Sequence, residues 1–304
     1  MSWEQTIDLF GPEQYGIKLL GFLAGIVILG VTCFIDDAKG IPSWVKLIAQ
    51  IVAATVVVAC GIRIQNIDIA FFEDKIWMND GASYLITIAW IIGITNAINL
   101  IDGLDGLSSG ITLISCISLL IIFTLNNSPL ISILLITALG GSIVGFLPFN
   151  FSPAKTFIGD TGSNFLGFSL AIISILGVAK TYTAIVLIAP IIVLALPIFD
   201  TLYAIVRRII KGKSLKAVFK ADKGHLHHRL MRRGYTQKQA VLILYALTAI
   251  LGMFAIVLLE SGIWKALSFA LIAVAIGAIG YKDLFKINQE ETIEPTQDHI
   301  RRDK

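Results

Sequence analysis

The stretch Asn96–Gly106, NAINLIDGLDG, places two asparagines and two aspartates between two apolar runs, Leu85–Ile94 and Ile111–Leu125. The aspartates, Asp102 and Asp105, are three residues apart, and the glycines allow the backbone to turn tightly. Charged side chains beside membrane-spanning segments are costly, so they usually face a polar cavity and serve a function. The stretch therefore predicts a polar site at the end of a membrane-spanning helix.

The composition of the whole chain is that of a polytopic membrane protein. The 304 residues are 56% hydrophobic and only 15% charged, and the mean hydropathy is +0.82. These values exclude an ordinary soluble domain, and because the apolar runs do not alternate as in a β-barrel, they predict an all-α helical bundle. A spanning helix needs about 20 apolar residues. Nine such spans are expected: Ile17–Ile35, Trp44–Ile62, Ala82–Ile101, Gly106–Leu125, Pro129–Leu147, Asn164–Ala179, Thr181–Phe199, Ala240–Leu259 and Ile263–Tyr281.

The charges predict how the bundle is oriented in the membrane. Arg207–Lys238 holds eleven lysines and arginines and one acidic residue, whereas Arg63–Asp80 holds two basic and four acidic residues. By the positive-inside rule, Arg207–Lys238 is predicted to be cytoplasmic and Arg63–Asp80 external. We expect one integral membrane domain over residues 1–287, followed by a polar cytoplasmic tail over residues 288–304.

Six aspartates follow alternate predicted spans. Every second crossing returns the chain to the same membrane face. All six are therefore predicted to lie at the cytoplasmic end of the bundle, beside the basic loop Arg207–Lys238. Carboxylates with nearby asparagine carbonyls suit a hard cation such as Mg²⁺, and lysine, arginine and histidine suit an anionic substrate. Together they predict metal-assisted phosphoryl transfer at a membrane surface. The six residues are Asp36, Asp37, Asp102, Asp105, Asp160 and Asp200.

The segment Pro148–Gly167, PFNFSPAKTFIGDTGSNFLG, leads into the sixth predicted span. Asp160 is flanked by Gly159 and Gly162, and Ser163 begins the next helix. Small residues let the backbone approach a ligand closely, and a helix N-terminus favours phosphate. A well-capped loop without a ligand is the alternative interpretation.

The basic loop contains the string HLHHR at His225–Arg229. A transition-metal cluster is one interpretation, but the string has no cysteines, and the neighbours His227 and His228 diverge on a helix. A grip on phosphate or pyrophosphate fits better. A topology signal alone would account for the lysines and arginines but not for the histidines.

These stretches resemble the polyprenyl-phosphate N-acetylhexosamine-1-phosphate transferase family, and they occur in the family's order over roughly Leu19–Leu230. Their joint occurrence is specific, although no single string is. The matching residues are Asp36-Asp37 with Lys46 and Gln50, NAINLIDGLDGLSSG from Asn96, FNFSPAKTFIGDTGS from Phe149, and the run from Pro197 through Asp200 and Arg207-Arg208 to HLHHRL at His225.

The resemblance implies transfer of a sugar 1-phosphate from a UDP-sugar to undecaprenyl phosphate, with release of UMP. It also implies a Mg²⁺ cofactor, with Mn²⁺ as an alternative, and a location in the plasma membrane. The H-x-H-H form is similar to the N-acetylglucosamine branch, which starts wall teichoic acid and other surface polysaccharides. Another UDP-amino sugar, such as UDP-MurNAc-pentapeptide, is the alternative.

Outside this class, a membrane cation or proton transporter competes with the enzyme, because acidic residues in a helical bundle can form an ion path. A transporter should place charges near the middle of its spans, and most span centres here are uncharged. A catalytically inactive membrane scaffold is a third reading. No nucleic acid is expected as a partner, and a homodimer is left open.

The resemblance also implies a role for each candidate residue. Asp160 would be a metal ligand, with Asn99 the second, and Asp36, Asp37 and Asp102 would be catalytic. Asp105 and Asn150 would bind the nucleotide, Phe157 would stack on uracil, and the histidines would hold the sugar diphosphate. The full substrate-binding set would be Lys46, Asp105, Asn150, Phe157, His225, His227, His228 and Arg229.

One departure concerns the beginning of the chain. Family members usually carry two further helices, joined by a basic cytoplasmic loop, before the span that ends in the paired aspartates. Here the chain begins after that point, so we expect these two helices to be absent, through a late gene start or a truncated form.

Overall fold

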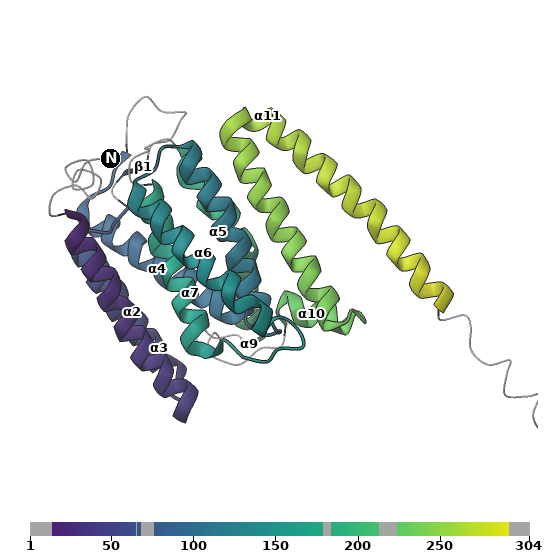
Figure 1. The fold of residues 1–304 in the computed structure, drawn as a ribbon, viewed down its shortest axis with the longest axis horizontal. Helices are drawn as coiled ribbons and strands as arrows, with labels where there is room; N and C mark the ends of the chain where they lie inside the picture. The colour runs from purple at the N-terminus through teal and green to yellow at the C-terminus, as the bar shows by residue number, and fades with distance from the viewer. Residues whose placement is uncertain (1–13, 65, 68–75, 179–183, 213–223, 292–304) are drawn as a thin grey trace, which may run out of the picture.

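The computed structural model describes residues 14–64, 66–67, 76–178, 184–212 and 224–291. Within these ranges the chain is helical apart from its connections and one antiparallel ladder of two residue pairs (Figure 1). The all-α prediction is therefore confirmed. The elements are α2 (Gln14–Lys39), α3 (Ser43–Ala59), β1 (Asn66–Ile67), β2 (Ile76–Trp77), α4 (Asp80–Ile101), α5 (Leu107–Leu125), α6 (Leu130–Asn150), α7 (Gly159–Val178), α8 (Ala184–Val193), α9 (Ala195–Gly212), α10 (Leu226–Arg232) and α11 (Gln237–Glu291).

Six of the described helices are long and apolar enough to cross a membrane: α2, α4, α5, α6, α7 and the first part of α11. This agrees with a multi-pass membrane protein, but the expected count of nine spans is not confirmed. Helix α3 has only 17 residues. The last predicted span, Ile263–Tyr281, belongs to the second part of α11, which follows a non-helical residue, Gly262. Helix α11 continues into the predicted tail as far as Glu291, and residues 292–304 lie outside the described ranges.

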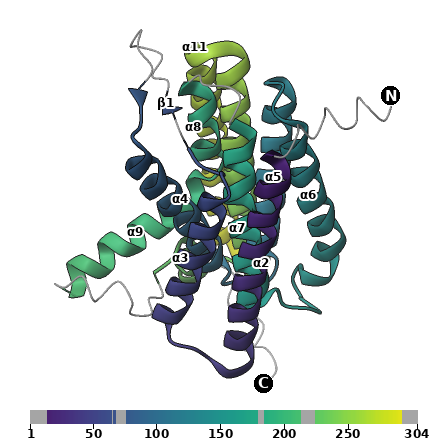
Figure 2. The same cartoon turned by 90° about the vertical axis from the view of Figure 1, so that its left-hand side faces the viewer.

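The predicted span Thr181–Phe199 is divided between two helices. Helix α8 ends at Val193, and α9 begins at Ala195 and runs away from the bundle at a steep angle (Figure 2). Pro197 has no N–H to donate, and its ring crowds the carbonyl of Val193, so one straight helix cannot pass this point. Residues 181–183 lie outside the described ranges.

Helix α7 is the centre of the bundle. It contacts α2, α4, α5 and α6, and 83% of an apolar stretch of 18 residues within it is buried. Gly167 permits the close contact with α4, because a Cβ there would lie 2.8 Å from the Cα of Thr95. In contrast, α2 exposes large apolar side chains such as Leu20, Val27 and Phe34 on its outer face, as a helix next to lipid can. The first turn of α7 is thus held among its neighbours at one end of the bundle.

Candidate active site

Polar side chains from four helices meet where α2 and α4 end and α7 begins. Lys46 Nζ lies 2.7 Å from Asp36 Oδ2 and 2.5 Å from Asp160 Oδ2. Asn99 Nδ2 donates to the other oxygen of Asp160, Oδ1, at 2.9 Å. We refer to Asp36, Asp37, Lys46, Asn99 and Asp160 as the polar cluster. One ammonium group thus lies between two carboxylates that are far apart in the sequence.

Asp37 caps the N-terminus of α7. Its carboxylate accepts hydrogen bonds from the backbone N–H groups of Asp160 at 2.9 Å and Thr161 at 3.0 Å, and from the Thr161 hydroxyl at 2.6 Å. These N–H groups have no partner within their own helix, and the helix dipole favours a negative charge there. Gly159 has φ 65°, and a Cβ at this position would lie 2.9 Å from Asp37 Oδ2. Glycine therefore permits both the turn and the cap.

A buried amide network supports the polar cluster from inside the bundle. Gln50 donates to Asn164 Oδ1 at 2.9 Å and accepts from Asn96 Nδ2 at 2.6 Å, and Asn164 donates to the backbone carbonyl of Asp160 at 2.8 Å. Gln50 and Asn164 are 3% and 1% exposed. Sequence reasoning gave no role to Asn96 or Asn164. Amide side chains at apolar helix positions were the available signal, because buried polar groups need partners.

A second group of predicted residues lies around the α4–α5 connection. Ser108 Oγ donates to Asp102 Oδ1 at 2.6 Å. Burial, reinforced by the charge of Asp160 and opposed by the Ser108 hydrogen bond, raises the pKa of Asp102 from 3.8 to about 6. Asp105 Oδ2 accepts the backbone N–H of Ala154 at 3.2 Å. Asp105 thus holds the segment that precedes Asp160.

Two residues predicted to bind the nucleotide differ sharply in exposure. Asn150 is 3% exposed, accepts from Ser109 Oγ at 2.8 Å and donates to the carbonyl of Thr156 at 2.9 Å. Phe157, the next residue, exposes 75% of its surface. Asn150 therefore shapes the connection between α6 and α7, while the Phe157 ring is free to stack on a planar group.

The histidine string, His225–Arg229, packs onto the stretch Asn96–Gly106. His227 is 1% exposed, and its ring lies so close to Gly103 that a Cβ there would collide with it. Burial, followed by the neighbouring His228 and His225, lowers the pKa of His227 from 6.5 to about 4. The rings of His225 and His227 are parallel, with centroids 5.9 Å apart. His227 is therefore neutral at pH 7, and the absence of a side chain at Gly103 makes room for it.

Two of the remaining predicted residues, His225 and Arg229, contact α9. His225 Nδ1 lies 2.8 Å from Asp200 Oδ2, so Asp200 pairs with a histidine and not with the polar cluster. The Arg229 guanidinium lies over the Tyr203 ring, 5.3 Å from its centroid. The His228 ring is 4.2 Å from that of His227.

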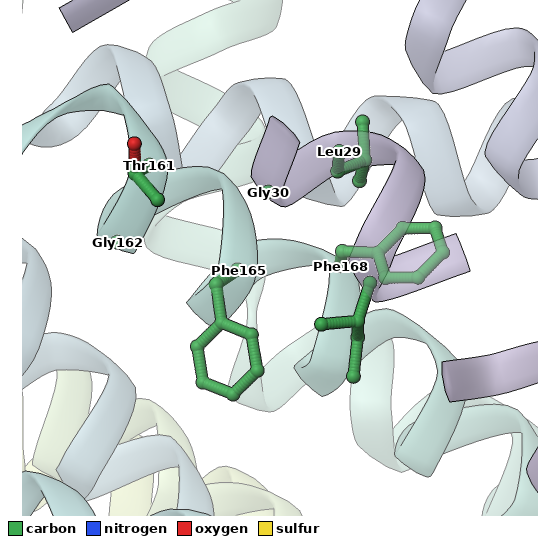
Figure 3. A pocket seen from close by; sticks show the side chains of 7 residues that line it. Leu29, Gly30, Thr161, Gly162, Phe165 and Phe168 are labelled. Carbon is green, nitrogen blue, oxygen red and sulfur yellow. The ribbon is translucent and has the colours of Figure 1, made fainter. Parts of the chain in front are cut away.

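An apolar pocket of about 290 Å³ adjoins the polar cluster between α2 and α7 (Figure 3). Thr161, whose hydroxyl bonds to Asp37, lies at this pocket. An apolar surface and the polar cluster are therefore adjacent. The other lining residues are Ile26, Leu29, Gly30, Gly162, Phe165 and Phe168.

The polar cluster suits a hard cation. In the described part of the chain, no three His, Cys, Asp or Glu side chains form a group that could hold a metal ion by themselves. However, Mg²⁺ keeps several waters and needs only one or two carboxylates beside substrate phosphates. Asp36 and Asp160 already share a cation, the Lys46 ammonium. Asn99 turns its amide nitrogen toward Asp160, so in this arrangement it orients the carboxylate.

Comparison with known proteins gives a family match. Residues 19–178 match the model described as "Glycosyl transferase family 4". The chain is 39% identical over 252 residues to the "Probable undecaprenyl-phosphate N-acetylglucosaminyl 1-phosphate transferase" of Bacillus subtilis (strain 168), covering 82% of this chain and 67% of that protein.

Two further relatives carry related names. The "Decaprenyl-phosphate N-acetylglucosaminephosphotransferase" of Mycobacterium leprae (strain TN) is 36% identical over 245 residues, which is 73% of this chain and 60% of that protein. The "Phospho-N-acetylmuramoyl-pentapeptide-transferase" of Bacillus subtilis (strain 168) is 33% identical over 265 residues, which is 84% of this chain and 75% of that protein. The chain thus spans three fifths to three quarters of the lengths of these three relatives.

Proposed function

The chain belongs to glycosyl transferase family 4, and we propose that it transfers N-acetylglucosamine 1-phosphate from UDP-N-acetylglucosamine to undecaprenyl phosphate. In this reaction an oxygen of the acceptor phosphate bonds to the sugar-bound phosphorus, and the bond from that phosphorus to UMP breaks. The names of the relatives from Bacillus subtilis and Mycobacterium leprae support the sugar and the class of lipid acceptor. Such a transfer is the first membrane step in making a surface polysaccharide such as wall teichoic acid.

The observation that carries the proposal is the pairing of Asp36 and Asp160 through Lys46. Transfer between two anionic substrates needs positive charge, and the protein mainly positions the reactants. Asp36 and Asp160 would hold Mg²⁺, which when bound neutralises the charge that develops on the phosphates. Asp37 holds the backbone of Asp160 in place, and Lys46 supplies a further positive charge.

The remaining predicted residues divide between the two ends of the donor substrate. Phe157 offers an exposed ring for uracil, next to the loop that Asn150 and Asp105 hold in shape. His228 and Arg229 supply donors for the sugar diphosphate. His227 contacts Gly103, and so keeps this string against the stretch that contains Asp102.

We place this site at the cytoplasmic face of the plasma membrane. The segment Arg207–Lys238, which includes α10, holds an excess of lysine and arginine, and His227 joins this segment to the site. UDP-sugars are cytoplasmic substrates, so this orientation gives the site access to the donor.

The test is transfer by the purified 304-residue chain in detergent, with UDP-[¹⁴C]N-acetylglucosamine and undecaprenyl phosphate. We expect labelled lipid and UMP in equal amounts, inhibition by EDTA and recovery with Mg²⁺. UDP-MurNAc-pentapeptide, the donor suggested by the second relative from Bacillus subtilis, is the matched alternative donor. Labelling only with that donor would overturn the choice of sugar, and no labelled lipid with either donor would overturn the transferase.

A further inference from the structure

Helix α9 holds the histidine string along one of its faces. Asp200, Tyr203 and Arg207 are three and four residues apart, so they project from the same side of the helix. Arg207 donates to the carbonyl of Gly224 at 2.5 Å, and Tyr203 stacks against Arg229. Asp200 completes the row through His225. Helix α9 thereby contacts Gly224, just before the string, as well as His225 and Arg229 within it.

The Asp200 carboxylate has both oxygens engaged. Oδ2 lies 2.8 Å from His225 Nδ1, and Oδ1 accepts the backbone N–H of Leu226, the first residue of α10, at 2.9 Å. Asp200 and His225 are 2% and 4% exposed. A carboxylate buried this deeply is costly unless it is hydrogen-bonded, and an ionised carboxylate can only accept. His225 must therefore carry a proton on Nδ1, the ring nitrogen that faces this carboxylate.

We propose that Asp200 is a positioning residue for the transfer reaction, which fixes His225 in the Nδ1–H form and sets the start of α10. A carboxylate that holds one ring nitrogen determines which nitrogen is left for another partner. Here Nε2 is left as a hydrogen-bond acceptor for a hydroxyl group of the bound sugar, and this part of the inference rests on the proposed function. This role of Asp200 differs from the sequence-based prediction, in which the alternation of spans grouped Asp200 with five other aspartates near a metal ion.

Asp200→Asn separates this role from a purely structural one. The amide has almost the same shape, and its oxygen can still accept the Leu226 N–H. Its NH₂ group, however, faces His225 Nδ1 as a donor and would shift the imidazole proton to Nε2. The fold is retained, while the nitrogen presented to the substrate changes its protonation. Asp80→Asn is the matched control, because Asp80 also pairs with a cation, Arg63 at 2.7 Å, but is 83% exposed and lies at the opposite end of α4.

The deciding measurement is the ¹⁵N spectrum of the purified chain with labelled histidine, in which His225→Gln assigns the His225 signals. We expect a protonated Nδ1 in the parent and in Asp80→Asn, and a protonated Nε2 in Asp200→Asn. Transfer by Asp200→Asn should show a kcat lower by about 10- to 100-fold, with the KM for undecaprenyl phosphate unchanged.

The spectrum distinguishes the two proposals. The positioning role would be contradicted, even in an active enzyme, if His225 of the parent were protonated on Nε2. It would also be contradicted if the proton stayed on Nδ1 in Asp200→Asn. A normal kcat in a variant whose tautomer has shifted would do the same. A chain with the expected tautomers but without transferase activity would remove the proposed function and leave the Asp200–His225 geometry intact.

Discussion

The carboxylate of Asp37 accepts two hydrogen bonds from Thr161, one from the backbone N–H at 3.0 Å and one from the hydroxyl at 2.6 Å. The two residues are 124 positions apart, so the last turns of α2 cap a helix from a distant part of the chain. Thr161 also lies at the apolar pocket between α2 and α7 (Figure 3). The contact therefore joins this apolar pocket to the polar cluster.

Asp37→Ala removes all three acceptor contacts of this cap. We expect the free energy of unfolding to fall by about 1 to 2 kcal/mol, as for loss of a helix cap, and transfer to fall as well because Asp160 loses its backbone partner. Denaturation in detergent and the transfer assay measure the two effects. Asn79→Ala is the control, since Asn79 caps α4 at the other end by accepting from Ala82 at 2.8 Å. It should lower stability and leave transfer unchanged.

Lys46→Met leaves two carboxylates facing each other without their shared ammonium. We expect a loss of about 2 kcal/mol in the free energy of unfolding, since the lost hydrogen bonds are to charged groups. Asp36→Asn in the same chain relieves part of the repulsion, so the double variant should be more stable than the sum of the single changes by about 1 kcal/mol. A double-mutant cycle by chemical denaturation measures this coupling. Additive losses would contradict the shared contact.

Asp160→Asn keeps the size of the side chain and removes its charge. It should still fold and insert, because the amide oxygen can accept from Asn99, although the amide NH₂ then faces the Lys46 ammonium and lowers the stability. Transfer should be lost at any Mg²⁺ concentration, since the phosphates then lack a carboxylate-held cation. Parental turnover in this variant would exclude Asp160 from the reaction.

The pKa of Asp102 predicts how stability depends on pH. Burial raises this pKa to about 6, so between pH 4 and 6 the folded chain holds a proton that the unfolded chain has released. The contribution of Asp102 to stability is therefore present below pH 4 and is lost as the pH rises through 6. Asp102→Asn has no such group. The Tm of the parent minus that of Asp102→Asn should fall as the pH rises and level off near pH 7, and a constant difference would contradict the assignment.

The orientation in the membrane is tested by labelling single cysteines in intact cells, in a chain whose three native cysteines are replaced by alanine. A cysteine at Asp80 should react with an impermeant reagent from outside, whereas one at Arg233 should react only after the cells are opened. Both positions are exposed. Reaction of the Arg233 position from outside would invert the topology and put the polar cluster on the external face.

The helices could be predicted from the sequence wherever the pattern was continuous. The apolar runs in α2, α4, α5, α6 and α7 predict helices because a membrane segment must satisfy its backbone hydrogen bonds internally. The span Thr181–Phe199 failed as one helix, since hydropathy does not register Pro197. The kinds of side chain in the site could also be predicted from the sequence, because carboxylates, amides and imidazoles are rare in such an apolar chain.

The sequence by itself determined the class of fold, the order of the helices and, through the alternation of crossings, that Asp36 and Asp160 could share one end of the bundle. Only the tertiary structure decided which groups touch. Lys46 lies between those two carboxylates, Asp37 caps α7, and Asp200 turns to His225. These contacts depend on how each helix is rotated about its own axis. That rotation is set by packing at close approaches such as Gly167 against α4, and no local pattern encodes it.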